Sequence, residues 1–389
     1  MYDVAIIGGG IIGASAAAFL AEAGASAVLF EQSQIAAAAS GRNSGVLQHP
    51  YDPVLARLHA ESLELYRQLA ADDGQFNVGE APAGVLLVSR GEEAVHETAR
   101  RLALATPELR PLPIPAGRLR RLEPTLAEDV AGCILQTGYP VVPAAATLAF
   151  ARRATRAGAQ LRVNAGAARP IVADGRAIGV VTEAGEQVRA GSVLVAAGPW
   201  TPPLVPGWDE RPPIYATWGV VVSVRLPAAP TAVLEELDID PTGLGEGISF
   251  SLVTAGGVSS VGSTFLAERP EPEQLRGRLI ARASTFVPAI AEAVDEGVRL
   301  CARPVSFDGR PLIGPVRGVD GLFVCAGHGP WGMSTGPASA RLVSSLILDR
   351  NNDVLAPAAL AATRFSASAE AGRELSSAAA LPSRRGRAG

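Results

Sequence analysis

The sequence predicts an α/β protein, α+β overall, in which an antiparallel sheet is inserted into a core of parallel strands and helices. Three observations indicate this fold class. The chain opens with "YDVAIIGGGIIGASAAAFL", a strand, a glycine turn and a helix. Runs of alternating polar and apolar residues fill the middle of the chain, as expected of antiparallel strands. Near the C-terminal end, "GLFVCAGHGPWGMSTGPASARL" repeats the strand–turn–helix pattern, so the core is expected to be discontinuous in sequence.

The first segment has the features of a Rossmann-like βαβ unit. Gly8, Gly10 and Gly13 form G-x-G-x-x-G between the strand and the helix, which allows a tight turn and a close approach of a pyrophosphate to the backbone. The second strand ends at Glu31, 18 residues after Gly13, where a carboxylate can accept hydrogen bonds from ribose hydroxyls. Together these features predict a dinucleotide site. The motif does not by itself separate NAD from FAD.

The remaining elements follow from hydrophobic periodicity. Residues 53–70 predict an amphipathic helix, 83–90 a strand and 143–159 another helix. A hairpin turn is expected near residues 183–185. Alternating runs between about residues 211 and 298 predict an antiparallel sheet with one polar face.

These elements predict two units and a tail. The cofactor-binding unit is expected to comprise residues 1–80, 145–210 and 300–355. The substrate-binding unit is expected to comprise residues 81–144 and 211–299. The Ala/Ser/Arg-rich segment 366–389 is expected to be a disordered tail.

Composition narrows the function. The 389 residues are 48% hydrophobic and 19% charged, as in a soluble enzyme, and the net charge of −4 argues against nucleic acid or an anionic membrane as the main partner. No run is long and apolar enough to span a bilayer, and no secretory leader is evident, so a cytoplasmic protein is expected. Three cysteines and four histidines have no metal-ligand spacing, so no metal site is expected. The chain has no lysine, which excludes a Schiff-base lysine, a P-loop lysine and a lysine general base.

Five further segments give the pattern its specificity: "SGRNSG" (40–45), "RRLEPTL" (120–126), "VLVAAGPW" (193–200), "ARPVSFDGRPLIGP" (302–315) and the glycine-rich stretch 321–342. With "VAIIGGGIIG", their order and spacing over about residues 1–350 resemble the D-amino acid oxidase family of FAD-dependent amine and amino acid oxidoreductases. The similarity is greatest to glycine oxidase-like and D-amino acid dehydrogenase-like members. The resemblance implies FAD as the cofactor.

The resemblance also implies a role for each glycine-rich turn. Ile11 and Ile12 would contact the pyrophosphate through their backbone, and Glu31 the adenosine ribose. The last turn would wrap the pyrimidine edge of the flavin, where a helix N-terminus stabilises the negative charge of the reduced ring. The complete expected cofactor set is Gly8, Gly10, Ile11, Ile12, Gly13, Glu31, Gln32, Ala39, Ser40, Arg42, Asn43, Ser44, Gly45, Val46, Ala197, Gly198, Trp200, His328, Gly329, Pro330, Trp331, Gly332, Met333 and Ser334.

For the substrate, the resemblance implies that Arg303 binds a carboxylate, although an internal ion pair with Asp308 is an alternative. Phe250 aligns with a substrate-binding tyrosine, and Pro330 stands where glycine oxidase has a second arginine, so a more apolar substrate pocket is expected. His49 is a further substrate-site candidate, which can equally carry a covalent flavin link or lie at the surface. The lysine that sarcosine oxidase-type members use for oxygen is absent, which leaves oxygen or another acceptor open.

The expected activity is oxidation of the C–N bond of a small amino or imino acid by hydride transfer to flavin N5, followed by hydrolysis of the imine. Three alternatives stay open. "GRNSGVL" also resembles the flavin loop of 2-hydroxy acid dehydrogenases. The chain can instead be the FAD-binding subunit of a hetero-oligomeric amine dehydrogenase, or an NAD-dependent dehydrogenase. The sequence is silent on substrate chirality and on oligomeric state.

Overall fold

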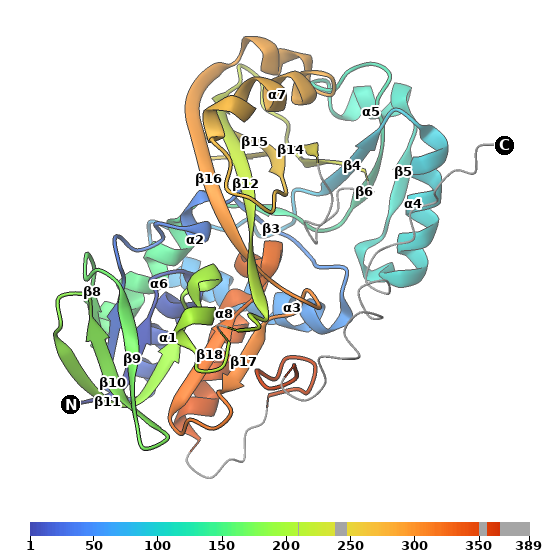
Figure 1. The fold of residues 1–389 in the computed structure, drawn as a ribbon. Helices are drawn as coiled ribbons and strands as arrows, with labels where there is room; N and C mark the ends of the chain where they lie inside the picture. Colours follow the sequence, from blue (N-terminus) through green and yellow to red (C-terminus); the bar gives the residue numbers. More distant parts are fainter. Residues whose placement is uncertain (209, 238–246, 350–355, 366–389) are drawn as a thin grey trace.

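The computed structural model describes residues 1–208, 210–237, 247–349 and 356–365. The described strands form two eight-stranded sheets and a small two-stranded one, and the long strands β12 and β16 run between the two halves of the molecule (Figure 1). The predicted α/β fold class, with parallel and antiparallel sheets in one chain, is confirmed. The expected tail, residues 366–389, lies outside the described residues.

The first sheet contains the parallel strands. Its order is β17-β18-β11-β1-β2-β8, and every neighbouring pair is parallel except β17–β18. The central strands are apolar along most of their length, because both faces are covered. Antiparallel β9 and β10 extend the sheet from β11, which confirms the predicted hairpin. The bounds are β1 Tyr2–Ile7, β2 Ala27–Phe30, β8 Gln160–Arg162, β9 Ala168–Ala173, β10 Arg176–Thr182, β11 Gln187–Val195, β17 Leu312–Pro315 and β18 Leu322–Ala326.

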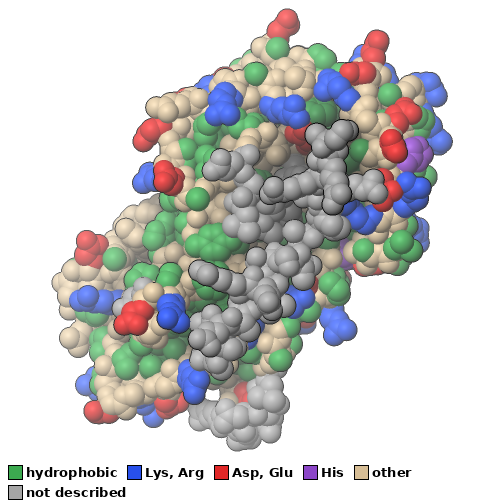
Figure 2. Space-filling view, turned by 45° about the vertical axis from the view of Figure 1, so that its right-hand side comes forward, with side chains coloured by type: hydrophobic (Ala, Val, Ile, Leu, Met, Phe, Trp, Pro, Cys, Tyr) green, Lys and Arg blue, Asp and Glu red, His purple; other side chains and the backbone are tan. Residues whose placement is uncertain are grey.

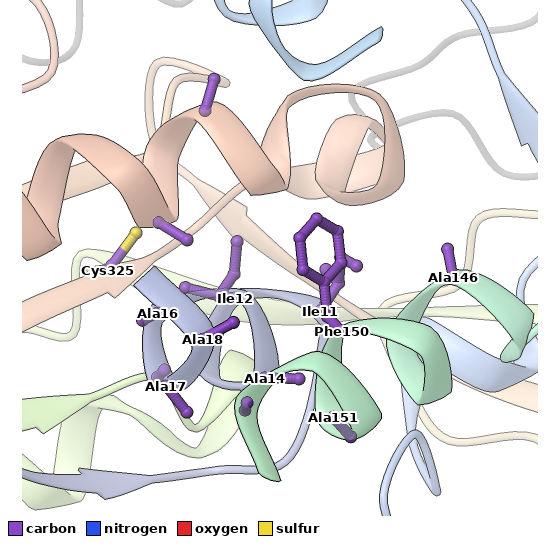
Figure 3. Packing of buried hydrophobic residues seen from close by; sticks show 14 of the residues in the cluster. Ile11, Ile12, Ala14, Ala16, Ala17, Ala18, Ala146, Phe150, Ala151 and Cys325 are labelled. Atoms are coloured by element: carbon purple, nitrogen blue, oxygen red, sulfur yellow. The ribbon is translucent and has the colours of Figure 1, made fainter. Parts of the chain in front are cut away.

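Helices α1 (Ile11–Glu22), α6 (Ala145–Arg156) and α8 (Gly332–Leu348) form a layer against this sheet. Figure 3 shows α1 between α8 and α6, with the small side chains of α1 in the contact. A methyl group added at Gly336 of α8 would lie only 3.1 Å from side-chain atoms of Ile11 and Ile12. The start of α1 and the first turns of α8 therefore lie side by side, although more than 300 residues separate them in sequence.

Helix α3 (Pro53–Asp72) supplies hydrogen bonds to α8 near a proline inside that helix. Pro337 lies inside α8 and has no N–H to donate to the carbonyl of Met333. The Tyr66 hydroxyl of α3 donates to that carbonyl instead, at 2.7 Å. The N–H of the next residue, Ala338, donates to the Ser62 hydroxyl at 3.1 Å. Side chains of α3 thus replace hydrogen bonds that the proline disrupts.

The second sheet has the order β16-β12-β15-β14-β13-β4-β6-β5. It is antiparallel except for the β13–β4 pair, which joins strands from two distant parts of the chain. Helix α7 (Pro272–Ser284) packs on one face, and α4 (Glu92–Ala105) and α5 (Ala116–Leu122) lie beside the β4–β6 end. The bounds are β4 Val85–Ser89, β5 Leu112–Ile114, β6 Ala131–Leu135, β12 Ile214–Arg225, β13 Val233–Glu236, β14 Ile248–Ala255, β15 Val258–Thr264 and β16 Val294–Ser306.

The expected boundary between residues 299 and 300 falls inside β16, a single strand of 13 residues. Arg303 therefore belongs to the second sheet and not to the parallel one. Short connecting elements lie between the two sheets: α2 (Ala39–Arg42), β3 (Val46–Leu47) and β7 (Tyr139–Pro140). On the face shown in Figure 2, basic and acidic side chains are interspersed, in keeping with the small net charge.

Candidate functional site

A cavity of about 740 Å³ lies between the two sheets and brings the two glycine-rich turns together. Both Gly10 and Gly332 line it, as do residues of β12, β14 and β16. Most of the expected cofactor residues line this one space, namely Gly8, Gly10, Ile11, Ile12, Glu31, Gln32, Ala39, Ser40, Arg42, Asn43, Ser44, Val46, Ala197, Gly198, Trp200 and residues 328–334. Gly13 and Gly45 do not line it.

The first turn packs too closely for any residue but glycine at two of its positions. Gly8 has φ +111°, and a methyl group there would lie 2.5 Å from the Ala196 carbonyl oxygen. A methyl group at Gly13 would overlap the carbonyl oxygen of Gly8. Gly13 therefore allows the helix to pack against its own turn, while Gly8 and Gly10 form the cavity wall. The Ile11 N–H, at the start of α1, donates to the Ser40 hydroxyl at 2.9 Å.

Glu31 is fixed at this end of the cavity by backbone N–H groups. One carboxylate oxygen accepts from the Gly9 N–H at 2.7 Å, and the other accepts from the Ser33 N–H at 2.9 Å. A carboxylate has about four acceptor positions, so further donors can still be bound. This geometry suits ribose hydroxyls beside the phosphate-binding turn.

The loop after β2 is held by Asn43. Its amide donates to the carbonyls of Ala39 and Ser40 at 3.1 and 2.9 Å, and its side-chain oxygen accepts from the Gly45 N–H at 2.8 Å. Gly45 has φ +86°, and a methyl group there would lie 2.5 Å from the Val141 carbonyl oxygen. Gly45 thus shapes the loop without facing the cavity.

The second turn presents a buried imidazole to the cavity. His328 is 2% exposed, and its Nε2 atom has no hydrogen-bond partner among the described residues. Burial lowers the pKa of His328 to about 3, so the ring is neutral. A buried polar atom without a partner is costly unless a ligand supplies one. The following residues begin α8, whose first N–H groups have no partners within the helix.

Arg303 lies at the opposite wall, on the face of the second sheet. Its guanidinium stacks on Phe265, 4.4 Å from the ring centroid, and donates to the Thr264 carbonyl at 2.9 Å and the Ser263 hydroxyl at 3.1 Å. The side chain crosses β12 over Gly219, where a methyl group would lie 2.6 Å from its Cζ. Burial lowers the pKa of Arg303.

The alternative role for Arg303, an ion pair with Asp308, is wrong. Asp308 pairs with Arg364 at 2.7 Å. Within the described ranges, no carboxylate lies within ion-pair distance of Arg303. A buried cation without a counter-ion is expensive, so an anionic ligand would lower its cost.

Two expected substrate residues do not reach the cavity. Along β14, Ile248, Phe250 and Leu252 share the face that packs into the core of the second sheet, and Ser251 lies on the opposite face. Phe250 is fully buried and stacks on Phe286 at 4.8 Å, and Ser251 lines the cavity in its place. His49 does not line the cavity, and its Nε2 is 3.6 Å from the Glu108 carboxylate.

Sequence reasoning missed a carboxyl group in the same cavity. Glu235 of β13 lines it, and the Gln48 amide donates to the carboxylate at 3.4 Å. Burial raises the pKa of Glu235 to about 7. The local pattern "VLEE" is that of an ordinary half-buried strand, so only the assembled sheet shows this position.

No group of three or more His, Cys, Asp or Glu side chains among the described residues is arranged to hold a metal ion. None of the described helices has the length and apolarity needed to cross a bilayer.

Comparison with known proteins agrees with this geometry. Residues 3–346 match the family model described as FAD dependent oxidoreductase (DAO). A glycine oxidase from Bacillus licheniformis is 26% identical, over 89% of this chain and 93% of its own length. A D-amino acid dehydrogenase from Sinorhizobium medicae is 30% identical over 46% of this chain and 42% of its own. The crystal structure of glycine oxidase from Bacillus cereus superposes with a TM-score of 0.76 at 27% identity, covering 90% of this chain and 95% of that one.

The geometry of the cavity suits the cofactor that the family description names. The glycine turn that approaches the backbone of β11, the fixed carboxylate of Glu31 and the unpartnered His328 all line one cavity, and all suit FAD. The family match covers nearly all of the chain that forms that cavity. This chain belongs to the D-amino acid oxidase family of FAD-dependent oxidoreductases.

Proposed function

We propose that this protein oxidises the C–N bond of a small amino or imino acid. The observation that carries the proposal is the buried Arg303, which has no carboxylate partner in the described chain and lies in the same cavity as both glycine-rich turns. A small carboxylate is the simplest ligand that neutralises it. Glycine oxidases and a D-amino acid dehydrogenase among the relatives support an amino acid as that ligand.

We assign different roles to the two walls of the cavity. Residues 8–12 and Glu31 would hold the phosphates and the ribose of FAD, and residues 328–334 its flavin edge. When bound, FAD supplies the hydride acceptor. We assign cofactor binding to the parallel sheet and its helices, and substrate binding to the second sheet.

Arg303 would fix the substrate by its carboxylate. Its guanidinium is held in place by Thr264, Ser263 and Phe265, so little freedom is lost when a ligand binds. Trp218 and Phe265 contribute apolar surface that excludes water from the reacting carbon. The imine that leaves the site hydrolyses in solvent without help from the protein.

The test is anaerobic bleaching of the purified yellow protein with a panel of amino, imino and 2-hydroxy acids, followed by product analysis. Release of ammonia or an amine supports the proposal, whereas bleaching by hydroxy acids alone supports the 2-hydroxy acid dehydrogenase alternative. Repeating the reaction with oxygen and with an artificial acceptor identifies the electron acceptor. The cytoplasmic location expected from the sequence stays a prediction.

Replacing Arg303 tests the binding mode. Arg303→Ala is expected to weaken binding of the carboxylate substrate by about 2–5 kcal/mol, because the partner charge is left unpaired. Arg225→Ala is the matched control, since Arg225 lies on β12 of the same sheet but pairs with Glu296 at the surface, at 3.0 Å. An unchanged KM in Arg303→Ala contradicts the assignment.

A further inference from the structure

Besides Arg303, the cavity contains a second ionisable group, the Glu235 carboxyl, whose function the fold does not explain. Glu235 lies on β13, directly opposite Ser251 of β14 and Leu87 of β4. Its carboxylate lines the cavity and receives one long hydrogen bond, 3.4 Å, from the Gln48 amide. Among the described residues, no arginine or histidine lies within ion-pair distance of it. Its neighbour Glu236, in contrast, pairs with Arg282.

Glu235 and Arg303 line the same cavity from nearby strands of the second sheet. The Arg303 guanidinium reaches over β12 to the end of β15, where it bonds Ser263 and Thr264. Strand β14 alone separates β15 from β13, so the two strands are roughly 10 Å apart. With hydrogen bonds of about 3 Å at each end, the remaining space suits the carboxylate and the nitrogen of one small amino acid.

Glu235 also lies toward the second glycine-rich turn. The N–H of Gln48 donates to the Ser334 hydroxyl in the first turn of α8, at 3.0 Å. The ring of Tyr51 packs edge-on against Trp331, with centroids 6.2 Å apart. Both Gln48 and Tyr51 line the cavity together with Glu235. The carboxyl group is therefore at the end of the cavity where the proposed function places the flavin.

Loss of hydride from an amino acid requires that its amine be neutral. At neutral pH an amino acid carries an ammonium group, which has no lone pair and cannot assist the loss of hydride from the adjacent carbon. We propose that Glu235 binds the substrate nitrogen and takes its proton. The N–H bond breaks, an O–H bond forms on the carboxyl group, and a neutral amine remains beside a neutral acid. This inference rests on the proposed function, because it needs an amine as substrate.

The surroundings of Glu235 allow both protonation states. Burial raises its pKa to about 7, and the Gln48 hydrogen bond opposes that rise. Tyr51 interacts electrostatically with Glu235 and with Cys133, and burial raises the pKa values of Tyr51 and Cys133, so both stay neutral at physiological pH. Strands β4 and β14 present Leu87 and Ser251, which do not titrate.

Two probes separate nitrogen binding from carboxylate binding. 2-Aminoisobutyrate has a carboxylate and an ammonium group but no α-hydrogen, so it cannot be oxidised, and isobutyrate lacks the nitrogen. Calorimetric titration of the holoenzyme at pH 8 should show that the wild type prefers 2-aminoisobutyrate by about ten- to a hundredfold. The preference should decrease as the pH falls through about 7.

Glu235→Gln should remove this preference and leave isobutyrate binding within about twofold of wild type. Glu128→Gln, at an exposed position, is the matched control and should behave as wild type. Arg303→Ala should weaken both probes, so a failure of carboxylate binding is seen separately from a failure of nitrogen binding. A preference for the amine that persists in Glu235→Gln overturns the inference.

A second measurement does not require either probe to bind. Because Glu235 is placed beside the flavin end, its ionisation should perturb the absorbance spectrum of the ligand-free holoenzyme with a midpoint near pH 7. Glu235→Gln should lack this transition, and Glu128→Gln should retain it. Identical spectral titrations of wild type and Glu235→Gln overturn the inference, whatever the probes do.

Discussion

Gly219 provides a way to move Arg303 without replacing it. The Arg303 side chain crosses β12 where Gly219 has no side chain, and a methyl group there would lie 2.6 Å from its Cζ. Carbon atoms at van der Waals contact are about 3.5–4 Å apart, so the guanidinium would have to move by about 1 Å. The Gly219 backbone is not in the left-handed region, so alanine is compatible with this position.

The displacement should affect binding more than folding. A guanidinium binds a carboxylate with two charge-assisted hydrogen bonds, each worth about 1.5–3 kcal/mol, and a shift of 1 Å misaligns at least one of them. We therefore expect Gly219→Ala to weaken substrate or isobutyrate binding by about ten- to a hundredfold. The free energy of unfolding should stay within about 1 kcal/mol of the wild-type value, because replacing glycine by alanine in a strand stabilises the protein by a similar amount.

Calorimetry with isobutyrate and urea unfolding measure the two effects on the same preparation. Gly277→Ala in α7 is the matched control, since a methyl group there meets no atom within 4 Å. If Gly219→Ala binds isobutyrate as tightly as wild type while remaining folded, Arg303 does not hold the carboxylate from the position seen here, and the reasoning fails.

Three further predictions concern stability and cofactor binding. Tyr66→Phe should lower the free energy of unfolding in urea by about 1–3 kcal/mol, because the buried Met333 carbonyl beside the α8 proline loses its donor. Tyr2→Phe, which removes an exposed hydroxyl, should change it by less than about 0.5 kcal/mol. Gly13→Ala should prevent FAD retention, seen as a colourless protein, since the added methyl overlaps Gly8. Glu235→Gln should raise the free energy of unfolding at pH 8 by about 2–3 kcal/mol and hardly at all at pH 4. The reason is that a carboxyl group whose pKa is raised in the folded state destabilises the folded protein as the pH rises from about 4.5 to about 7.

The sequence was most informative where function depends on local backbone geometry. The spacing of Gly8, Gly10 and Gly13 with Glu31 defines a βαβ unit within about 30 residues, and the structure contains that unit. The glycine-rich start of α8 is equally local. That the two turns share one cavity followed only from the family resemblance, because the contact of Gly336 with Ile11 and Ile12 joins opposite ends of the chain.

The substrate wall depended on sheet assembly, which the sequence pattern does not show. In β14, Phe250 lies on the face that packs against Phe286, and Ser251 lies on the face that lines the cavity. The alternating pattern alone does not show which of these two faces borders the cavity. The position of Glu235 depends on the parallel pairing of β13 with β4, two strands nearly 150 residues apart. Arg303 was found through its family motif, but its reach across Gly219 was not.

The two walls of the cavity differ in how much they use main-chain groups and how much they use side chains. On the side that we assign to the cofactor, the side chains of Glu31 and His328 are joined by backbone N–H donors and by glycines whose added methyl groups would collide with main-chain atoms. On the side that we assign to the substrate, the groups that line the cavity are side chains on strands, among them Arg303, Glu235 and Ser251. Side chains can be exchanged without altering the path of the backbone. With the roles proposed above, substitutions on the second sheet are expected to change the substrate preference of this protein without altering the backbone of the first glycine-rich turn.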